Sequence, residues 1–554
     1  MINLPLPRAI AYNALLNDIE RGVIKIPQFQ RDYVWSKENA AKLIDSILKG
    51  YPIGTFITWK TKEQLRVIKN LGNYDLPIVP AGDFSIYVLD GQQRMTSLFC
   101  ALKGVSIKRE KSIDNFSEIY IDLNASQHDQ IVVVDNSQLK FGEFINLTNL
   151  LSNDFTMLAS FRTDYGQKLH EYRNTIQGYQ FSLIEVVDAP LDVATEIFTR
   201  INIGGKPLTL FEIMVAKTFD AEKQFDLAEK FDQLRLRLAN VGYDTISSAT
   251  VLQTIALVTG TECKRQNILQ LDKARFIEEW FKVASAIESA VDYFRSYYRI
   301  PVSNLLPYNT LLAPFSYFFY KHKDKPIGDK QRYLEDFMWR VSLGGRYSSS
   351  VESKLAQDID RIDKILENEK PEYDWAIDTS SEFINKNGWF NTGRSYIKAL
   401  LCILAYYEPK SFVDGSIVHI SNDWLKQANS RNYHHFFPRS FLRKNNINDD
   451  LSNHIGNITI VDDYLNKREI AAKAPSVYMN NFSNKNPELK KHMETHLIEL
   501  DSWGIWDDDY EIFLQKRCKR LSDEIKKRLI FCKNDTSYQP IYLDDVEEDY
   551  NDEI

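Results

Sequence analysis

The spacing of apolar residues changes once along the chain, near residue 190, and this change constrains the fold more than any other feature. Before it, short apolar runs predict strands at 56–59, 85–90, 117–123 and 130–135, with one amphipathic helix at 39–50. After it, apolar residues recur at helical spacing over long stretches. The pattern predicts an α+β protein of several domains, mixed in its first part and helical in its middle.

The helical part has five candidate amphipathic segments, at residues 192–201, 208–241, 273–298, 332–343 and 351–369. Residues 370–383 interrupt this pattern and predict a boundary to a further domain. A chain of 554 residues is also too long for one compact core. We therefore expect a mixed domain at 1–225, a helical domain at 226–375, a C-terminal domain at 376–540 and an acidic tail at 541–554.

Charge and cysteine usage narrow the class of protein. The net charge of −8 argues against a uniformly basic nucleic-acid coat, although a local basic face is enough for DNA binding. The five cysteines show no CxxC spacing, which argues against a disulfide framework and a Cys-ligated zinc site. No signal-peptide pattern and no membrane-spanning apolar run is evident. We expect a cytoplasmic protein that does not bind membranes.

Histidines are concentrated near the C-terminus, where four of the nine lie between His419 and His454. The adjacent pair His434 and His435 is followed by Pro438, and then by two asparagines in the order Asn457 and Asn466. Phosphodiester hydrolysis needs a base for water and a cation that neutralises developing charge. An imidazole suits the first task near neutral pH, and a second imidazole with an amide oxygen suits the second.

This order of residues resembles the ββα-metal, or HNH, nuclease pattern, in which a hairpin carries the histidine pair and Pro while a helix supplies the final Asn. The resemblance implies that His434 and Asn466 bind Mg²⁺ or Mn²⁺ and that His435 is the general base. It implies that Asn457 braces the loop of the histidines, so that the four catalytic candidates are His434, His435, Asn457 and Asn466. Lys467 and Arg468 would lie near the DNA phosphate. His454 has no such part and is expected to be a surface or turn histidine.

Four motifs mark the N-terminal part: IPQFQRDYVW at 26–35, YPIGTF at 51–56, LDGQQRMTSL at 89–98 and FTRINIGGKPLTLFE at 198–212. The DGQQR stretch follows a predicted strand and precedes a helical run that starts near Met95. Asp90 could hold a cation, Gly91 permits a tight turn, and Arg94 offers a fork for phosphate. The amides at the start of the helix would then face an anion.

The four motifs in this order resemble the ParB-like N-terminal domain of the GmrSD family of restriction enzymes, which is found with an HNH domain, as in nucleases of the SspE and BrxU type. The resemblance implies binding and hydrolysis of a nucleoside triphosphate, GTP or ATP. It assigns nucleotide binding to Asp90, Gly91, Gln92, Gln93, Arg94, Gln30, Arg31, Arg200 and Asn202. It also implies DNA as partner, modified or from phage, and a homodimer is a possible assembly.

Taken together, these patterns favour an NTP-regulated, modification-dependent DNA endonuclease in antiphage defence. Two alternatives stay open. One is a nuclease toxin that acts on host nucleic acid. The other is a sensor that binds modified DNA without cutting it, and the intact histidine pair with both asparagines favours cutting over this reading.

Overall fold

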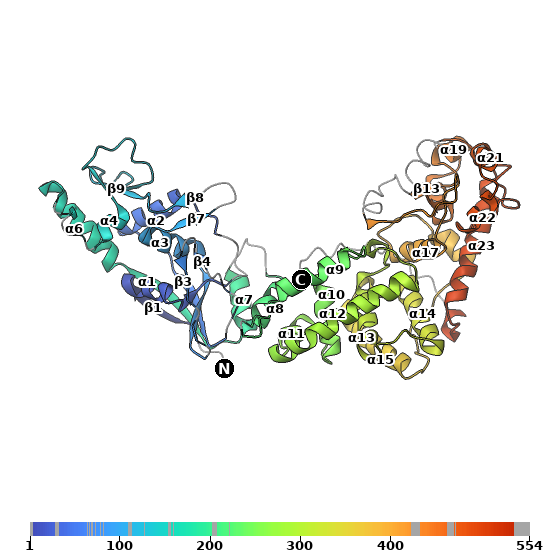
Figure 1. The fold of residues 1–554 in the computed structure, drawn as a ribbon, viewed down its shortest axis with the longest axis horizontal. Coiled ribbons are helices and arrows are strands. Elements are labelled where there is room, and N and C mark those ends of the chain that lie inside the picture. The colour runs from blue at the N-terminus through green and yellow to red at the C-terminus, as the bar shows by residue number, and fades with distance from the viewer. Residues whose placement is uncertain are drawn as a thin grey trace. The chain divides into compact units, whose positions relative to one another are not determined.

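The protein folds into two compact units, Met1–Leu227 and Ala228–Ile554 (Figure 1). The computed structural model describes residues 4–536, except for 28–32, 64, 66, 68–69, 72–73, 78, 81, 109–112, 127, 153, 155–156, 159, 202–207, 221, 423–432, 462–469 and 471. The first unit mixes strands and helices, and the described part of the second is almost entirely helical. Within the described residues, no helix has the length and apolarity that a membrane crossing requires.

The first unit is built on a five-stranded mixed sheet in the order β1-β12-β3-β6-β2. Its strands are β1 (Leu6–Ala11), β12 (Gln180–Val187), β3 (Phe56–Thr61), β6 (Ser85–Asp90) and β2 (Ile24–Lys25). β12 runs parallel to β3 and β2 parallel to β6, whereas β1 pairs with β12 and β3 with β6 in antiparallel fashion. The strands predicted at 56–59 and 85–90 are thereby confirmed and lie side by side.

Shorter strands and the helices complete the first unit. The strands are β4 (Asn70–Leu71), β5 (Tyr74–Asp75), β7 (Ser106–Lys108), β8 (Ile113–Asn115), β9 (Tyr120–Asp122), β10 (Val132–Val133) and β11 (Phe144–Asn146). The helices are α1 (Tyr12–Glu20), α2 (Lys37–Leu48), α3 (Gln92–Lys103), α4 (Leu147–Leu151), α6 (Thr163–Gly178), α7 (Leu191–Ile201) and α8 (Leu210–Thr218). β9 and β10 pair with each other and confirm strands in the runs predicted at 117–123 and 130–135.

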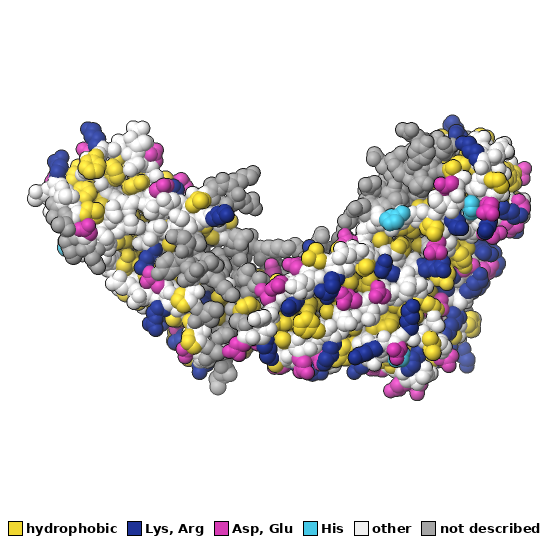
Figure 2. Space-filling model, in the orientation of Figure 1, with side chains coloured by type: hydrophobic (Ala, Val, Ile, Leu, Met, Phe, Trp, Pro, Cys, Tyr) yellow, Lys and Arg dark blue, Asp and Glu magenta, His cyan; other side chains and the backbone are white. Residues whose placement is uncertain are grey.

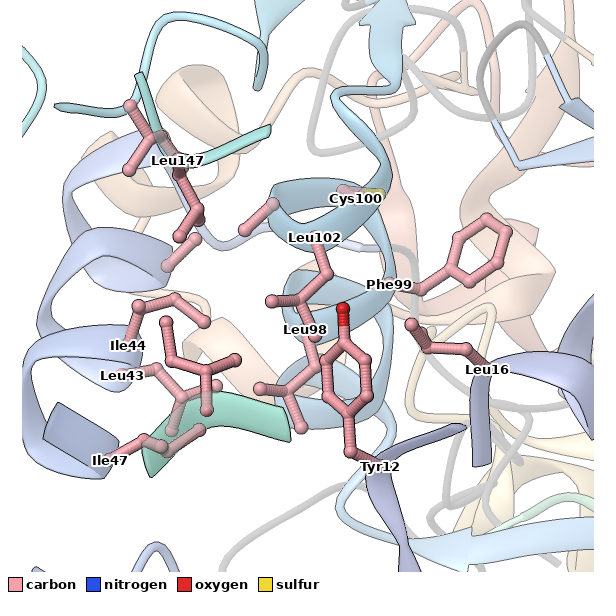
Figure 3. Packing of buried hydrophobic residues seen from close by; sticks show 14 of the residues in the cluster. Tyr12, Leu16, Leu43, Ile44, Ile47, Leu98, Phe99, Cys100, Leu102 and Leu147 are labelled. Atoms are coloured by element: carbon pink, nitrogen blue, oxygen red, sulfur yellow. The ribbon is translucent and has the colours of Figure 1, made fainter. Parts of the chain in front are cut away.

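The core of the first unit forms where α2 and α3 pack together (Figure 3). In α2, Leu43, Ile44 and Ile47 share one helical face and are buried, as the spacing predicts. They meet Leu98 and Leu102 of α3 in the same apolar cluster. This packing fixes the start of α3, where the DGQQR motif lies.

The second unit contains the long helices. They are α9 (Leu227–Ala239), α10 (Ser248–Val258), α11 (Arg265–Leu269), α12 (Lys273–Ser296), α13 (Leu312–Lys321), α14 (Gly328–Leu343), α15 (Val351–Leu366), α16 (Ser381–Asn387), α17 (Ser395–Tyr406), α19 (Arg439–Lys444), α20 (Asp449–Ser452), α21 (Pro475–Lys485), α22 (Leu489–Glu494) and α23 (Tyr510–Arg528). Its strands are β13 (Tyr433–His435) and β14 (Ile458–Ile460). Helices predicted at 273–298, 332–343 and 351–369 are confirmed as α12, α14 and α15.

The single long helix expected at 208–241 is wrong, because the chain breaks between α8 and α9. Asp220 and Phe225 exchange two backbone hydrogen bonds of 2.9 and 2.8 Å, which closes a tight turn. Gln224 inside this turn has a φ of 50°, in the left-handed region that interrupts a helix. The apolar spacing continues across the turn, so periodicity alone does not reveal it.

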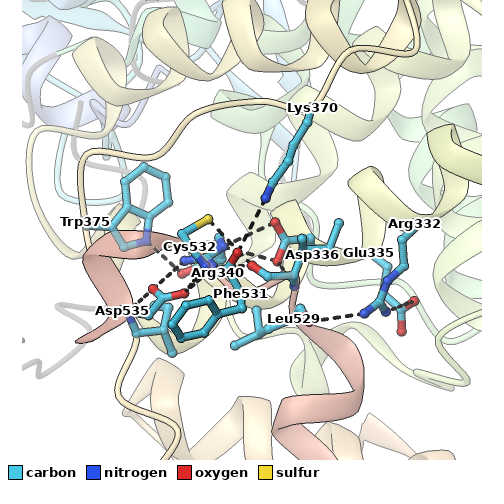
Figure 4. Close-up of polar contacts among 12 residues, drawn as sticks. Arg332, Glu335, Asp336, Arg340, Lys370, Trp375, Leu529, Phe531, Cys532 and Asp535 are labelled. Atoms are coloured by element: carbon cyan, nitrogen blue, oxygen red, sulfur yellow. Dashed lines mark hydrogen bonds and ion pairs between the residues drawn. The ribbon is translucent and has the colours of Figure 1, made fainter. Parts of the chain in front are cut away.

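A buried ionic cluster ties α14 to the segment that follows α23 (Figure 4). Arg340 is fully buried and binds Asp336 on its own helix and both carboxylate oxygens of Asp535 at 2.9 and 2.7 Å. Its guanidinium also donates to the carbonyl oxygen of Ile530 at 2.7 Å. Trp375 donates to the carbonyl of Arg340 at 3.2 Å. Residues on both sides of position 375 are therefore joined within one unit.

Candidate functional site

The histidine pair lies on a short hairpin in the second unit. β13 pairs with β14 in antiparallel fashion, with His434 opposite Thr459 and His435 opposite Ile458. Because successive side chains of a strand point to opposite faces, the two imidazoles leave β13 on opposite sides. Each one therefore meets different neighbours.

His434 is buried, with 2% of its surface exposed. Its Nδ1 lies 2.9 Å from Thr459 Oγ1, and that hydroxyl donates its own proton to the carbonyl oxygen of His434 at 3.3 Å. The hydroxyl can therefore only accept from the ring, which places the imidazole proton on Nδ1. Nε2 is buried and has no hydrogen-bond partner among the residues that the structure describes. Burial, followed by the neighbouring His435 and His496, lowers the pKa of His434 to about 3, so the ring is neutral with its Nε2 lone pair unused.

His435 is half-buried, and its hydrogen bond is made by Nε2, whereas that of His434 is made by Nδ1. Its Nε2 lies 2.9 Å from the Oδ1 of Asn453, which follows α20. Among the described residues, no hydrogen bond to Nδ1 is found. Burial lowers the pKa of His435, the bond to Asn453 opposes this shift, and the positive charge of Arg439 adds to it. The ring is therefore biased toward the neutral form that a base requires.

Asn457 is fully buried in η4 (Ile455–Asn457), directly before β14. Its Oδ1 accepts from the amide of Phe437 at 2.8 Å, and its Nδ2 donates to the carbonyls of Phe437 and Ser452, both at 3.0 Å. These three bonds connect the end of α20 to the turn that follows His435. They hold the backbone on which the histidines are mounted.

The described residues test the predicted metal centre only in part. The buried and unpartnered Nε2 of His434 is chemically suited to bind a divalent ion, and the Thr459 bond to Nδ1 is the kind of support that metal-binding histidines use. Among the described residues, no group of three or more His, Cys, Asp and Glu side chains is close enough to hold a metal ion. Asn466, Lys467 and Arg468 lie outside the described residues.

His454, for which the sequence predicts a surface or turn position, does not lie on the surface but at the start of η4. It is buried, with its Nε2 3.1 Å from the carbonyl of Ile384 and its Nδ1 accepting from the amide of Gly456 at 3.0 Å. Both ring nitrogens are hydrogen-bonded, so the imidazole connects α16 to η4. Burial lowers its pKa to about 4.

Sequence reasoning missed two polar residues beside the hairpin. One is Asn453, described above. The other is Arg517 of α23, which is fully buried and donates to the carbonyls of His496 and Ile458, the latter at 3.3 Å. Burial lowers the pKa of Arg517 to about 9. The signal in the sequence that could have identified Arg517 as buried is its position on the apolar side of α23.

The remaining basic residues of α23, other than Arg528, are exposed along one side of the second unit, where they alternate with acidic side chains (Figure 2). Lys519 pairs with Asp523 at 3.0 Å and Lys527 with Glu524 at 2.6 Å. Arg528, like Arg517, is buried. Part of the positive charge that α23 exposes is thus already neutralised by acidic side chains of the same helix.

The DGQQR motif of the first unit forms the junction between β6 and α3. Asp90 ends the strand, and Gly91 has a φ of 90°, which any side chain would strain. A Cβ at Gly91 would also lie 2.6 Å from the ring of Phe56. α3 begins at Gln92, three residues earlier than the expected start near Met95, so the two glutamines belong to the helix.

The sequence suggests that the guanidinium of Arg94 is available to bind a phosphate, but in the structure it is already hydrogen-bonded within the protein. It donates to the carbonyls of Ile53 and Thr55 at 2.8 and 3.1 Å, and it pairs with Asp90 at 3.2 Å. Its guanidinium also lies over the ring of Phe56, 5.2 Å from the centroid. The arginine therefore fastens the YPIGTF loop to the DGQQR motif.

The two glutamines differ in how they are used. Gln93 Oε1 accepts from the amides of Val34 and Trp35 at 2.9 and 3.3 Å, which joins the IPQFQRDYVW motif to α3. Gln92 is buried, and within the described part of the chain its Nε2 has no hydrogen-bond partner. Three of the four motifs thus meet at the start of α3.

Other predicted nucleotide residues are not brought to this junction by any contact that the structure shows. Arg200 lies in α7 with its side chain largely exposed, and it pairs with Glu196 at 2.5 Å, one turn earlier. Gln30, Arg31 and Asn202 lie outside the described residues. The described part of the candidate nucleotide site is therefore Asp90 to Arg94.

Comparison with known proteins identifies the first unit. Residues 12–219 match the family model of the N-terminal domain of GmrSD restriction endonucleases. An uncharacterized protein of Methanocaldococcus jannaschii is 26% identical over 568 residues, which covers 93% of this chain and 94% of that protein. The matched residues contain α3, all four motifs and the strands of the sheet except β1, which ends at Ala11. Residues 12–219 therefore form an N-terminal domain of the GmrSD restriction endonuclease type.

Proposed function

We propose that this protein is a DNA endonuclease whose hydrolytic centre is the hairpin carrying His434 and His435, and whose activity is regulated by a nucleoside triphosphate and by DNA modification. One observation carries the nuclease part of the proposal. Two adjacent neutral histidines, His434 buried and His435 half-buried, each have one ring nitrogen held by a neighbouring side chain and the other ring nitrogen without a partner among the described residues. In the proposed HNH-type centre, the free nitrogen of His434 would bind the metal and the free nitrogen of His435 would act as the base.

The chemistry assigned to these residues is phosphodiester hydrolysis. His435 takes a proton from a water molecule through Nδ1, and the water oxygen attacks phosphorus as the bond to the leaving 3′ oxygen breaks. His434 and Asn466 would bind Mg²⁺ or Mn²⁺, which neutralises charge on the phosphate and the leaving oxygen. Asn457 keeps the turn after His435 in place through its three backbone contacts. Lys467 and Arg468 would contact the phosphate backbone.

For the first unit, we propose that the start of α3 binds a nucleotide, GTP or ATP. The buried Nε2 of Gln92 is a donor that the described fold leaves unused. Asp90 is half-exposed at the same junction and is able to face a nucleotide-bound cation. Arg94 contributes by holding the YPIGTF loop in place, and its guanidinium does not make a two-pronged contact with a phosphate. Arg200, Gln30, Arg31 and Asn202 remain further candidates.

The decisive experiment compares wild type, His435→Ala and His419→Ala on modified and unmodified plasmid and phage DNA. Each reaction contains Mg²⁺ or Mn²⁺, with and without GTP or ATP. His419 is exposed in the same unit, so its variant controls for histidine removal as such. Loss of the base should lower cleavage by roughly 10²- to 10⁴-fold, while DNA binding and the His419→Ala variant stay normal.

The outcomes separate the candidate functions. Cleavage that depends on His435, on DNA modification and on nucleotide supports the proposal in full. Equal cleavage by His435→Ala overturns the assigned centre. Binding of modified DNA without cleavage would identify a sensor, and cleavage of unmodified host DNA or RNA would identify a toxin.

A further inference from the structure

Asn453 is held rigidly against a segment that precedes it by about sixty residues. Its carbonyl oxygen accepts from the amide of Phe390 at 2.9 Å, and the amide of Ile455 donates to the carbonyl of Gly388 at 2.7 Å. These bonds flank a bridge between Trp389 and His454. The backbone at Asn453 therefore has little freedom to move relative to residues 388–390.

The side chain of Asn453 is oriented by the same segment. Its amide group lies 3.1 Å from the carbonyl oxygen of Phe390. A carbonyl oxygen only accepts hydrogen bonds, so the NH₂ end of the amide must face Phe390 and the Oδ1 end must face away. Oδ1 is the atom that lies 2.9 Å from His435 Nε2.

The orientation of this amide decides where His435 carries its proton. Oδ1 only accepts, and a neutral imidazole has one N–H. The bond therefore exists only when the proton is on Nε2, which leaves the lone pair on Nδ1. His434 shows the opposite arrangement, with the proton on Nδ1 through Thr459.

We propose that Asn453 is a positioning residue that fixes the Nε2–H tautomer of His435, so that Nδ1 is the atom that accepts a proton from water. This inference rests on the proposed nuclease function for its catalytic meaning, but not for the tautomer itself. Phe390 belongs to the arrangement, because its carbonyl sets the direction of the Asn453 amide. The adjacent histidines then hold opposite tautomers, which gives each a different chemical task.

The tautomer is measured directly by two-bond ¹H–¹⁵N NMR on the full-length, metal-free protein labelled with [¹⁵N]histidine. His435→Gln identifies the signals of His435. We expect the Nε2–H pattern for wild type and for Asn453→Asp, which keeps an acceptor at this position. Asn453→Ala should show a mixture of tautomers. An Nδ1–H pattern in the wild type would overturn the proposal whatever the variants do.

Cleavage kinetics provide the second readout. Removing a side chain that orients a functional histidine costs about 10- to 100-fold, so Asn453→Ala should lower kcat by this factor while the Kd for DNA is unchanged. Asn453→Asp should recover most of the rate. Asn445→Ala is the matched control, because Asn445 is exposed and its side chain contacts only the carbonyl of Phe441.

The two proposals fail in different ways. Full cleavage by Asn453→Ala, together with loss of cleavage in His435→Ala, rejects the positioning role and keeps the nuclease. Full cleavage by His435→Ala rejects the nuclease centre, while the NMR result still decides the tautomer. If Asn453→Ala does not fold, the wild-type tautomer and the rate of Asn453→Asp test the inference without it.

Discussion

The DGQQR junction of the first unit and the histidine hairpin of the second use their polar residues in opposite ways. At the junction, Arg94 and Gln93 bind backbone groups of neighbouring motifs, and the buried Nε2 of Gln92 has no hydrogen-bond partner among the described residues. At the hairpin, each histidine has one nitrogen fixed and the other without a partner among the described residues. The first arrangement holds loops together, and the second leaves ring nitrogens available to a ligand.

This difference shows that residue type alone does not separate a ligand-binding arginine from a structural one. An arginine that already binds two carbonyls and a carboxylate must lose those bonds before it can hold a phosphate with its fork. The unused lone pair of a buried imidazole has no hydrogen bond to offset the cost of its own burial, and such an unsatisfied group is often found at a functional site. The following predictions contrast the two regions, beginning with the largest effect.

The two units should respond differently to mild acid. Burial lowers the pKa values of His454 and His496 to about 4, whereas His128 and His170 of the first unit are exposed. Because the pKa of each buried histidine is lower in the folded than in the unfolded state, its neutral form stabilises the second unit above pH 6.5. This contribution to the free energy of unfolding is lost as the pH falls toward 4. Between pH 6.5 and pH 5 the loss is at most about 2 kcal/mol per histidine.

Hydrogen exchange on the full chain, resolved by peptide, measures this contrast. Protection should fall in α16 and η4 between pH 6.5 and pH 5, after correction for the intrinsic exchange rate, and persist in α3. His454→Gln should flatten the response, because glutamine does not take up a proton in this range. Equal loss of protection in both units would show that the buried histidines do not control acid stability.

Arg94→Met should destabilise the first unit by about 3 kcal/mol, because two carbonyls and one carboxylate lose a charged donor. Arg200→Met is the matched control, since its exposed pair with Glu196 contributes little. Calorimetry of the full chain measures both. A normal melting temperature for Arg94→Met with lost nucleotide binding would mean that this arginine serves the ligand, and the contrast between the regions would fail.

Part of this structure was predictable from sequence because it depends on local periodicity. Apolar spacing located β3, β6, α12, α14 and α15, and the order of residues identified the family. The break before α9 depends on one residue with positive φ, Gln224, which carries no apolar signal. The partners of Arg94 and of Asn453 come from loops that are distant in sequence, so only the folded chain shows which polar groups they satisfy.

Thr459→Val should weaken Mn²⁺ binding about 10- to 100-fold, because it removes the acceptor that fixes the His434 tautomer. Valine keeps the shape of threonine, so the melting temperature should change little. Titration calorimetry with Mn²⁺ alone, without DNA, measures the affinity independently of cleavage. Unchanged Mn²⁺ affinity in Thr459→Val would indicate that His434 does not bind the metal through Nε2.

The smallest effect concerns DNA contacts and separates α19 from α23. α19 starts four residues after His435, and its Arg443 is 70% exposed with only a 3.5 Å pair to Asp449. If DNA reaches the hairpin, Arg443→Ala should weaken binding equally for all sequences and reduce the slope of log Kd against log salt by about one. Lys519 of α23 already pairs with Asp523 on its own helix, so Lys519→Ala should leave the slope unchanged. The reverse result would place the DNA along α23 and would separate the basic helix from the histidines as the main binding surface.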